Sequence, residues 1–297
     1  MLRRLGGLPL APLRGMLSSR PVNLRPRSCA PLSSASGGQA LVKVDKALSG
    51  DSRMAVVSMA RAPVNSLNLE LVQQLNEAIE GLEQDPEVQG FILTSSQKKV
   101  FCAGIDLTTM HQPNMDDLNA FWKGLQSLWS SLYGTRLATV AAIQGAAPAA
   151  GCLLALSCDY RVIAKGYSLG MNETKFGLVA PPWFQQTLVS TVGNRQAESL
   201  LLKGTLVDSS TALKIGMVDE EVEESEVMGA AEKELGAMLG VNQKARQTTK
   251  MALRMPMMQS MKEAFDTDRE WFMSMVQSPE IQAGLGAYIE SLQKRKK

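Results

Sequence analysis

The sequence contains a single histidine, His111, in 297 residues. Histidine is the usual base of catalytic triads and a common metal ligand, so its scarcity excludes most sites of both kinds. Cysteine is also sparse, and the four cysteines form no CxxC pair. Three of them, Cys102, Cys152 and Cys158, lie in apolar stretches, which is typical of buried free thiols in a reducing compartment.

The sequence also lacks a strong charge imbalance and long apolar runs. Its formal net charge is +2, so we expect no general binding to nucleic acid. No apolar run reaches the ~18–20 residues that a membrane span requires. With 45% hydrophobic and 20% charged residues, the chain can bury a substantial core, in one large domain or two smaller ones.

Acidic residues are absent from the N-terminal segment, and the first one in the chain is Asp45. The segment is rich in Leu, Ser and Pro, and its apolar pieces are interrupted by Arg3, Arg4, Arg14, Arg20, Arg25 and Arg27. A secretory signal would have a longer unbroken apolar region, so this composition predicts a mitochondrial transit peptide over residues 1–40 and a protein of the mitochondrial matrix. A disordered basic tail with another role is the alternative.

Strand and helix patterns alternate after this segment. Predicted strands cover residues 40–45, 53–60, 90–95, 139–143, 159–164 and 217–222. Predicted helices cover residues 68–84, 116–133, 183–192, 195–202 and 209–215. The aromatic side chains of the second helix, Phe121, Trp122 and Trp129, are expected in the core or in the wall of a hydrophobic tunnel. The alternation predicts an α/β architecture of repeated units.

From Ser225 onward the pattern is helical, with helix boundaries expected near Gly240, Pro256 and Pro279. Many methionines occur in this part, and their flexible side chains suit adaptable apolar packing. We expect the region over residues 225–297 to form a lid or an oligomer interface.

Small residues fill the loop after the strand over residues 139–143, and a helix opens at about Ala149. Such residues allow a ligand to approach the backbone, and the free N–H groups of the helix's first turn favour negative charge. A lone carboxyl group, Glu173, follows in a segment with few charges. An oxyanion-stabilising backbone and one acid suggest proton abstraction next to a carbonyl. Close packing alone, with Asn172 as a helix cap, is the competing interpretation of this pattern.

Three motifs together resemble the enoyl-CoA hydratase/isomerase (crotonase) superfamily. They are Phe-Cys-Ala-Gly-Ile-Asp-Leu at residues 101–107, Ile-Gln-Gly-Ala-Ala-Pro-Ala-Ala-Gly-Cys at 143–152, and Ser-Cys-Asp-Tyr-Arg at 157–161. The segment over residues 169–183 is similar to the isomerase branch of that family. The resemblance implies a crotonase-like spiral of repeated ββα units over residues 41–224, a C-terminal helical region, an acyl-CoA thioester substrate and a homotrimer.

In the family, two backbone N–H groups hold the thioester oxygen, and the matching residues here are Ile105 and Ala150. The resemblance also places Ala103, Gly104, Asp106, Leu107 and Asn172 in the substrate site. The family usually has a Gly-Gly-Gly-like stretch in the second loop, where this sequence has Ala149-Ala150-Gly151. A backbone donor does not require glycine, so Ile105 and Ala150 remain the expected donors.

The carboxyl groups distinguish the reactions of the family. Family hydratases use two glutamates to add water, and the matching positions here are Leu153 and Glu173. One base still suffices to move a proton between two carbons, so the resemblance implies an isomerase that converts cis- or trans-3-enoyl-CoA into trans-2-enoyl-CoA in fatty-acid β-oxidation. An apolar surrounding, for which Leu153, Phe176 and Trp183 are candidates, would raise the pKa of Glu173 toward neutrality.

Two alternatives remain open at this stage. One is a hydratase or another acyl-CoA isomerase in which Asp106 or Asp159 replaces the missing acid, and the other is a non-catalytic acyl-CoA-binding protein. The expected reaction needs no metal or redox cofactor, because the thioester itself accepts the electrons. Candidates for binding the CoA phosphates are Lys98, Lys99, Lys250 and Arg254.

Overall fold

Two β-sheets form the framework of the computed structural model, which describes residues 39–295. The larger sheet has the strand order β1-β2-β3-β5-β7-β10, and all its pairs are parallel except β1 with β2. Its strands are β1 (Val42–Lys46), β2 (Met54–Met59), β3 (Gly90–Ser95), β5 (Ala138–Ile143), β7 (Tyr160–Ala164) and β10 (Glu220–Val222). The smaller sheet has the order β4-β6-β8-β9, with β4 (Lys99–Val100), β6 (Gly145–Pro148), β8 (Ser168–Gly170) and β9 (Val207–Asp208).

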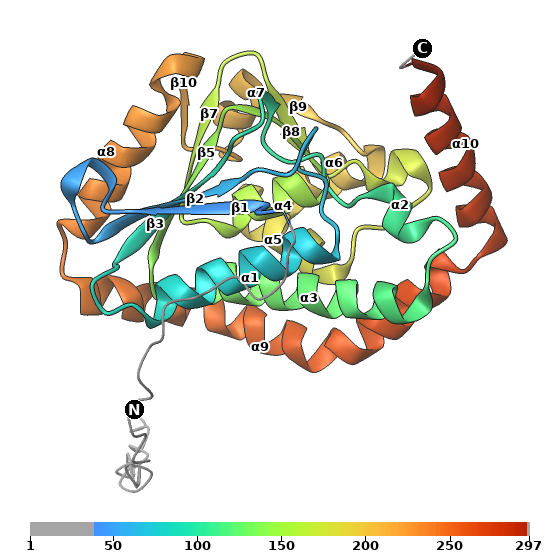
Figure 1. Cartoon of the computed structure of the whole chain (residues 1–297), viewed down its shortest axis with the longest axis horizontal. Coiled ribbons are helices and arrows are strands. Elements are labelled where there is room, and N and C mark those ends of the chain that lie inside the picture. Colours follow the sequence, from blue (N-terminus) through green and yellow to red (C-terminus); the bar gives the residue numbers. More distant parts are fainter. Residues whose placement is uncertain (1–38, 296–297) are drawn as a thin grey trace, which may run out of the picture. The chain divides into compact units, whose positions relative to one another are not determined.

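From β3 to β8, successive strands alternate between the two sheets. In each of three consecutive pairs, the first strand belongs to the larger sheet and the second to the smaller one. The pairs are β3 with β4, β5 with β6, and β7 with β8. Helices follow these pairs: α2 (Leu107–Met110) and α3 (Met115–Gly134) after the first, and α4 (Ala150–Ser157) after the second. This repetition of two strands and a helix confirms the predicted spiral of ββα units (Figure 1).

Alternate side chains of the larger sheet pack into two separate apolar clusters, as the period of two in a β-strand requires. On one face, Val56, Ile92, Val140 and Val162 pack against α8 (Val227–Leu239). The other face belongs to the main core, which also includes buried residues of α1 (Leu69–Gln84), α3, α4 and α5 (Pro182–Val192). The remaining short helices are η1 (Leu48–Gly50), η2 (Glu173–Phe176), α6 (Asn194–Lys203), α7 (Ser209–Lys214) and η3 (Glu224–Glu226).

The C-terminal part ends in two long helices, α9 (Gln243–Val276) and α10 (Pro279–Arg295). The predicted boundary near Pro256 is wrong, because α9 continues through that proline. Proline removes one helical hydrogen bond and crowds the carbonyl four residues earlier, and the packing of α9 along α3 offsets this cost (Figure 1). The boundaries near Gly240 and Pro279 are confirmed.

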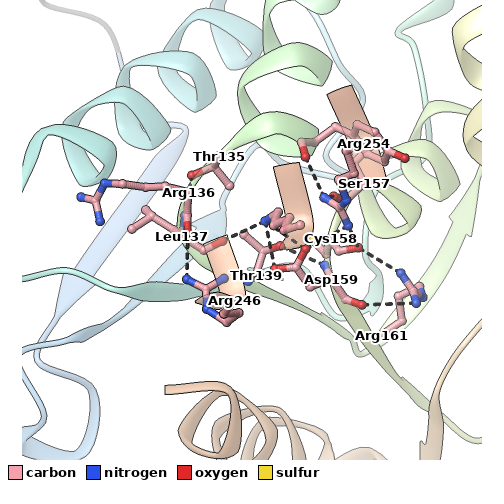
Figure 2. A network of polar contacts seen from close by, with 12 residues as sticks. Thr135, Arg136, Leu137, Thr139, Ser157, Cys158, Asp159, Arg161, Arg246 and Arg254 are labelled. Atoms are coloured by element: carbon pink, nitrogen blue, oxygen red, sulfur yellow. Dashed lines mark hydrogen bonds and ion pairs between the residues drawn. The ribbon is translucent and has the colours of Figure 1, made fainter. Parts of the chain in front are cut away.

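Basic side chains of α9 anchor this helix to the core. Lys250 and Arg254, one helical turn apart, each lie 2.9 Å from Oδ1 of Asp159. Arg254 also donates to the main-chain carbonyl of Ser157, at the C-terminal end of α4 (Figure 2). It donates likewise to the carbonyl of Tyr133, near the C-terminal end of α3. Cationic groups at helix C-termini are favourable, because the helix dipole is negative there.

Three further sequence predictions concern the N-terminal segment, residues 145–148 and the division of the chain. The transit peptide predicted over residues 1–40 lies almost wholly outside the described residues. Residues 145–148, expected as a loop, form β6 instead, because two short strands, β4 and β8, flank them and pair with their backbone groups. Ala40–Lys297 is one compact unit, so the spiral over residues 41–224 and the helical region over residues 225–297 belong to the same unit.

Candidate active site

A cavity of about 160 Å³ contains the residues that the sequence motifs singled out. The loop after β4 contributes Ala103 and Ile105, the start of α2 contributes Leu107, and the start of α4 contributes Ala150. Asn172 and Glu173 line the same cavity. Among the described residues, Glu173 is the one carboxyl group in this lining. The cavity therefore joins an acid to two backbone segments that lie far apart in the sequence.

Glu173 is the first residue of η2, and its carboxyl group is largely withdrawn from water. Its Oε2 atom is buried and has no hydrogen-bond partner in the structure. Burial raises the pKa of Glu173 from its ordinary value of 4.5 to about 7, against a smaller lowering by a hydrogen bond from its own backbone N–H. A carboxyl group with this pKa exchanges a proton readily near neutral pH.

The first loop presents Ile105 through a single parallel bridge to Leu67. The Leu67 N–H donates to the Gly104 carbonyl at 2.8 Å, and the Asp106 N–H donates to the Leu67 carbonyl at 2.9 Å. In a parallel bridge of this kind, the N–H of the central residue points away from its partner strand. The N–H of Ile105 is therefore directed away from Leu67 and is free to serve a ligand.

The second loop presents Ala150 at the first position of α4. The N–H groups of a helix's first turn have no acceptor within the helix. Ala149, which precedes it, has φ 52° and ψ −125°, a conformation that a non-glycine residue rarely adopts. The Ala149 N–H donates to the Gly170 carbonyl at 2.7 Å, which holds this backbone in place. Strained backbone of this kind is frequent at functional sites.

The two loops are in close contact with each other. At Gly151, an added Cβ would lie 2.1 Å from the Cys102 carbonyl oxygen, so only glycine fits there. The loops owe their adjacency to the smaller sheet, since β4 and β6 pair in parallel directly before them. Gly151, the third residue of the Ala149-Ala150-Gly151 stretch, is therefore a glycine that this packing requires.

The structure separates the predicted substrate-site residues into two groups. Ala103, Ile105, Leu107, Ala150 and Asn172 line the cavity, together with Glu173. Asn172 occupies the N-cap position of η2, as the alternative expected, but its side chain makes no capping hydrogen bond there.

Two residues of the predicted set, Gly104 and Asp106, are not among the lining residues. Asp106 caps α2 by accepting from the Thr108 N–H and forms a 2.8 Å ion pair with Arg61. Its role is therefore to stabilise the loop.

The acids and bases proposed as alternatives are occupied elsewhere. Asp159 is paired with Lys250 and Arg254, and none of the three lines the cavity. Figure 2 shows Asp159 and Arg254 in this network. Burial, opposed by the attraction of Asp159, lowers the pKa of Lys250 to about 8. Lys98 and Lys99 are exposed and are not among the lining residues of the cavity. Leu153, at the position of the missing acid, is fully buried in the main core.

The sequence motifs did not predict the wall that the C-terminal helices add to the cavity. Phe272 and Met275 of α9 and Tyr288 of α10 line it, and the Tyr288 ring meets the Phe176 ring edge-on at 4.9 Å. Trp122 also lines it, so the expectation of a tunnel wall is confirmed for this member of the aromatic helix. The methionine-rich composition of these helices was the only signal, and it does not distinguish a cavity wall from ordinary core.

No helix within residues 39–295 combines the length and apolar character of a membrane span. The same residues contain no group of three or more His, Cys, Asp or Glu side chains arranged to hold a metal ion.

Comparison with known proteins places this chain and its fold in one family. Residues 50–296 match the family model described as enoyl-CoA hydratase/isomerase. The chain is 40% identical to mitochondrial enoyl-CoA delta isomerase 1 of Mus musculus over 249 residues, which cover 83% of this chain and 86% of that protein. The Homo sapiens protein of the same name is 40% identical over 82% of this chain and 81% of that protein.

Solved structures agree with these relatives. The crystal structure of human mitochondrial delta3-delta2-enoyl-CoA isomerase superimposes with a TM-score of 0.83 at 38% identity, covering 86% of this chain and all of that one. An enoyl-CoA hydratase from Bacillus halodurans shares the fold, with a TM-score of 0.76 at 23% identity over 84% of this chain and all of that one. This chain belongs to the enoyl-CoA hydratase/isomerase family.

Proposed function

We propose that the chain is an enoyl-CoA delta isomerase of fatty-acid β-oxidation, which converts 3-enoyl-CoA into trans-2-enoyl-CoA. The observation that carries this proposal is one desolvated carboxyl group, Glu173, in the same cavity as the two backbone segments at Ile105 and Ala150. The similarity to proteins named enoyl-CoA delta isomerase supports the same activity.

In the first step, the Glu173 carboxylate removes a proton from C2 of the substrate. The electron pair of that C–H bond moves into the neighbouring thioester, and a dienolate with negative charge on the thioester oxygen forms. Backbone N–H groups of Ile105 and Ala150 donate to this oxygen. Each such donor lowers the barrier by roughly 3–4 kcal/mol in a site from which water is excluded.

In the second step, the protonated Glu173 returns the proton to C4, and the double bond moves into conjugation with the thioester. The raised pKa of Glu173 suits both steps, because a strongly acidic carboxyl group would take the first proton poorly. No net proton is gained or lost. The thioester accepts the electrons transiently, so the sequence of steps requires neither a metal ion nor a redox cofactor.

Hydration would need a second acid to orient and deprotonate water. Leu153 stands at the corresponding position and is fully buried among apolar side chains. Asp106 and Asp159, the possible substitutes, are held in ion pairs away from the cavity lining. The site therefore favours movement of a double bond over addition of water.

We further propose that the protein acts in the mitochondrial matrix as a homotrimer. The location is supported by the basic, acid-free N-terminal segment and by the mitochondrial names of the relatives. The assembly is supported by the family resemblance and by large apolar side chains that α9 leaves exposed, with Leu253 77% and Met255 42% accessible.

The test is conversion of a 3-enoyl-CoA by the purified protein, followed by the ultraviolet absorbance of the conjugated product. Glu173→Gln should lower kcat by ~10²–10⁴-fold or more while substrate binding persists. Conversion that survives this substitution would contradict the role of Glu173. Loss of conjugated 2-enoyl-CoA with formation of a hydroxyacyl product would instead identify a hydratase.

A further inference from the structure

Asp268 of α9 is a buried carboxyl group with an unusual set of partners. Its Oδ2 atom accepts three hydrogen bonds, from Trp122 Nε1 at 2.9 Å, Gln126 Nε2 at 2.9 Å and Trp183 Nε1 at 3.1 Å. Its Oδ1 atom is buried and has no hydrogen-bond partner. Among residues 39–295, no lysine or arginine forms an ion pair with it.

This arrangement holds three helices together through one atom. Trp122 and Gln126 belong to α3, Trp183 belongs to α5, and Asp268 belongs to α9. A buried carboxylate without a cation costs free energy, and the three donors offset that cost. The indole N–H groups would themselves be left unpaired without the carboxylate. Because hydrogen bonds are directional, they restrict ring orientations that apolar packing alone leaves free.

The rings that Asp268 restrains form part of the cavity wall. Trp122 stacks on Phe272 with ring centroids 3.5 Å apart and an interplanar angle of 9°, and both rings line the cavity beside Glu173. Phe272 lies one helical turn after Asp268, on the same face of α9. Trp183 contacts Phe184, a third lining residue, with centroids 4.6 Å apart. One carboxylate therefore connects three aromatic parts of the wall.

We propose that Asp268 is a positioning residue that sets the acyl-chain selectivity of this cavity. It holds the Trp122–Phe272 stack in place, and this stack limits the room available to the acyl chain of the substrate. The inference rests on the proposed acyl-CoA isomerase function. Asp268 touches neither the substrate nor the reacting atoms; it acts through the side chains that do.

The test compares the selectivity of the native protein with that of Asp268→Ala. The ratio of kcat/KM for 3-dodecenoyl-CoA to that for 3-hexenoyl-CoA should rise by about fivefold or more in the variant, mainly through KM, because a released wall admits the longer chain. Asp268→Asn should keep the ratio of the native protein. Its amide oxygen replaces Oδ2 and its NH₂ group replaces the unpartnered Oδ1.

A matched control removes a similar bond beside the same aromatic cluster. The Trp129 Nε1 atom donates to the Thr187 hydroxyl at 3.0 Å, and neither residue lines the cavity. Thr187→Val should lower stability without changing the ratio. If Asp268→Ala does not fold, Gln126→Met is the alternative variant. It removes one of the three donors to Asp268 at similar side-chain volume, and the ratio of kcat/KM values should shift in the same direction. An unchanged ratio in the folded variants, with equal losses for both substrates, would overturn the proposal.

Binding measurements separate this proposal from the isomerase assignment. Calorimetry with saturated hexanoyl-CoA and dodecanoyl-CoA reports the same selectivity without turnover. A native protein that binds both ligands but converts no 3-enoyl-CoA would contradict the isomerase function alone. A binding ratio that Asp268→Ala leaves unchanged would contradict the role of Asp268 alone.

Discussion

Gly104 and Ala149 lie against each other at the contact between the two loops, and both have positive φ angles, 87° and 52°. A Cβ added to Gly104 would lie 3.0 Å from the Cβ of Ala149 and 3.4 Å from the Ala150 nitrogen. Each residue directly precedes a proposed oxyanion donor, Ile105 or Ala150. The same backbone feature thus occurs in both loops, and the spacing between the donors depends on the missing side chain of Gly104.

Gly104→Ala should therefore impair catalysis more than stability. The left-handed conformation costs alanine ~1–2 kcal/mol, and the methyl group also pushes the two loops apart. Displacement of one donor should lower kcat by roughly 10²-fold or more. The measurement is kcat with a 3-enoyl-CoA beside the melting temperature.

A matched control is available at Gly216, which has φ 73° and open space where a Cβ would be added. Gly216→Ala should show a similar loss of stability with normal kcat. Equal activity in the two variants would contradict the importance of the loop contact.

The pH dependence of the reaction should follow Glu173. The carboxylate is the active base for the first step, and burial raises the pKa of Glu173 to about 7. We expect kcat/KM to level off above this pH and to fall about tenfold per pH unit well below it, as for a single essential base. An acid limb centred near the ordinary value of 4.5 would show that Glu173 is well solvated in the free enzyme.

The same pKa predicts that Glu173 lowers stability as the pH rises to neutrality. Between pH 4.5 and about 7, the folded protein binds this proton more tightly than the unfolded chain, so stability is lost as pH rises through this window. Glu173→Gln removes the buried charge, and its gain in unfolding free energy over the native protein should grow by up to roughly 3 kcal/mol between pH 4.5 and pH 8.

Denaturant unfolding at the two pH values measures this gain, with Glu77→Gln on the exposed face of α1 as the control. The control should show little change between the two pH values. A gain for Glu173→Gln that is the same at both pH values would contradict the raised pKa.

Asp159 should matter for stability rather than for chemistry. Asp159→Asn leaves the buried Lys250 and the partly buried Arg254 without their shared counter-charge. Loss of one partner of a buried ion pair costs about 3–5 kcal/mol, and we expect a loss of this order in denaturant unfolding. Glu198→Gln, which breaks the exposed pair with Arg195, should change stability little. A small effect of Asp159→Asn would show that these ion pairs contribute little to holding α9.

Sequence patterns predicted strongly periodic elements of ordinary length well, although they broke the longest helix, α9, at Pro256. The strand over residues 90–95 matches β3, and the helix over residues 68–84 differs from α1 by one residue at its start. The hydrophobic residues of both segments recur with a clear period. The α1 helix also begins after a capping residue, Asn68, whose side chain accepts from the Leu71 N–H. Short strands such as β4, with two residues, were missed because so few residues establish no period.

The sequence by itself determined the α/β class, the identity of the single acid and both loops, because these depend on local composition and on motifs along the chain. Tertiary structure decided which residues meet. Lys250 and Arg254 became anchors of α9, whereas Phe272 and Tyr288 became part of the cavity wall. Their partners are distant in the chain, and only the packed fold establishes the burial that gives Glu173 a pKa of about 7.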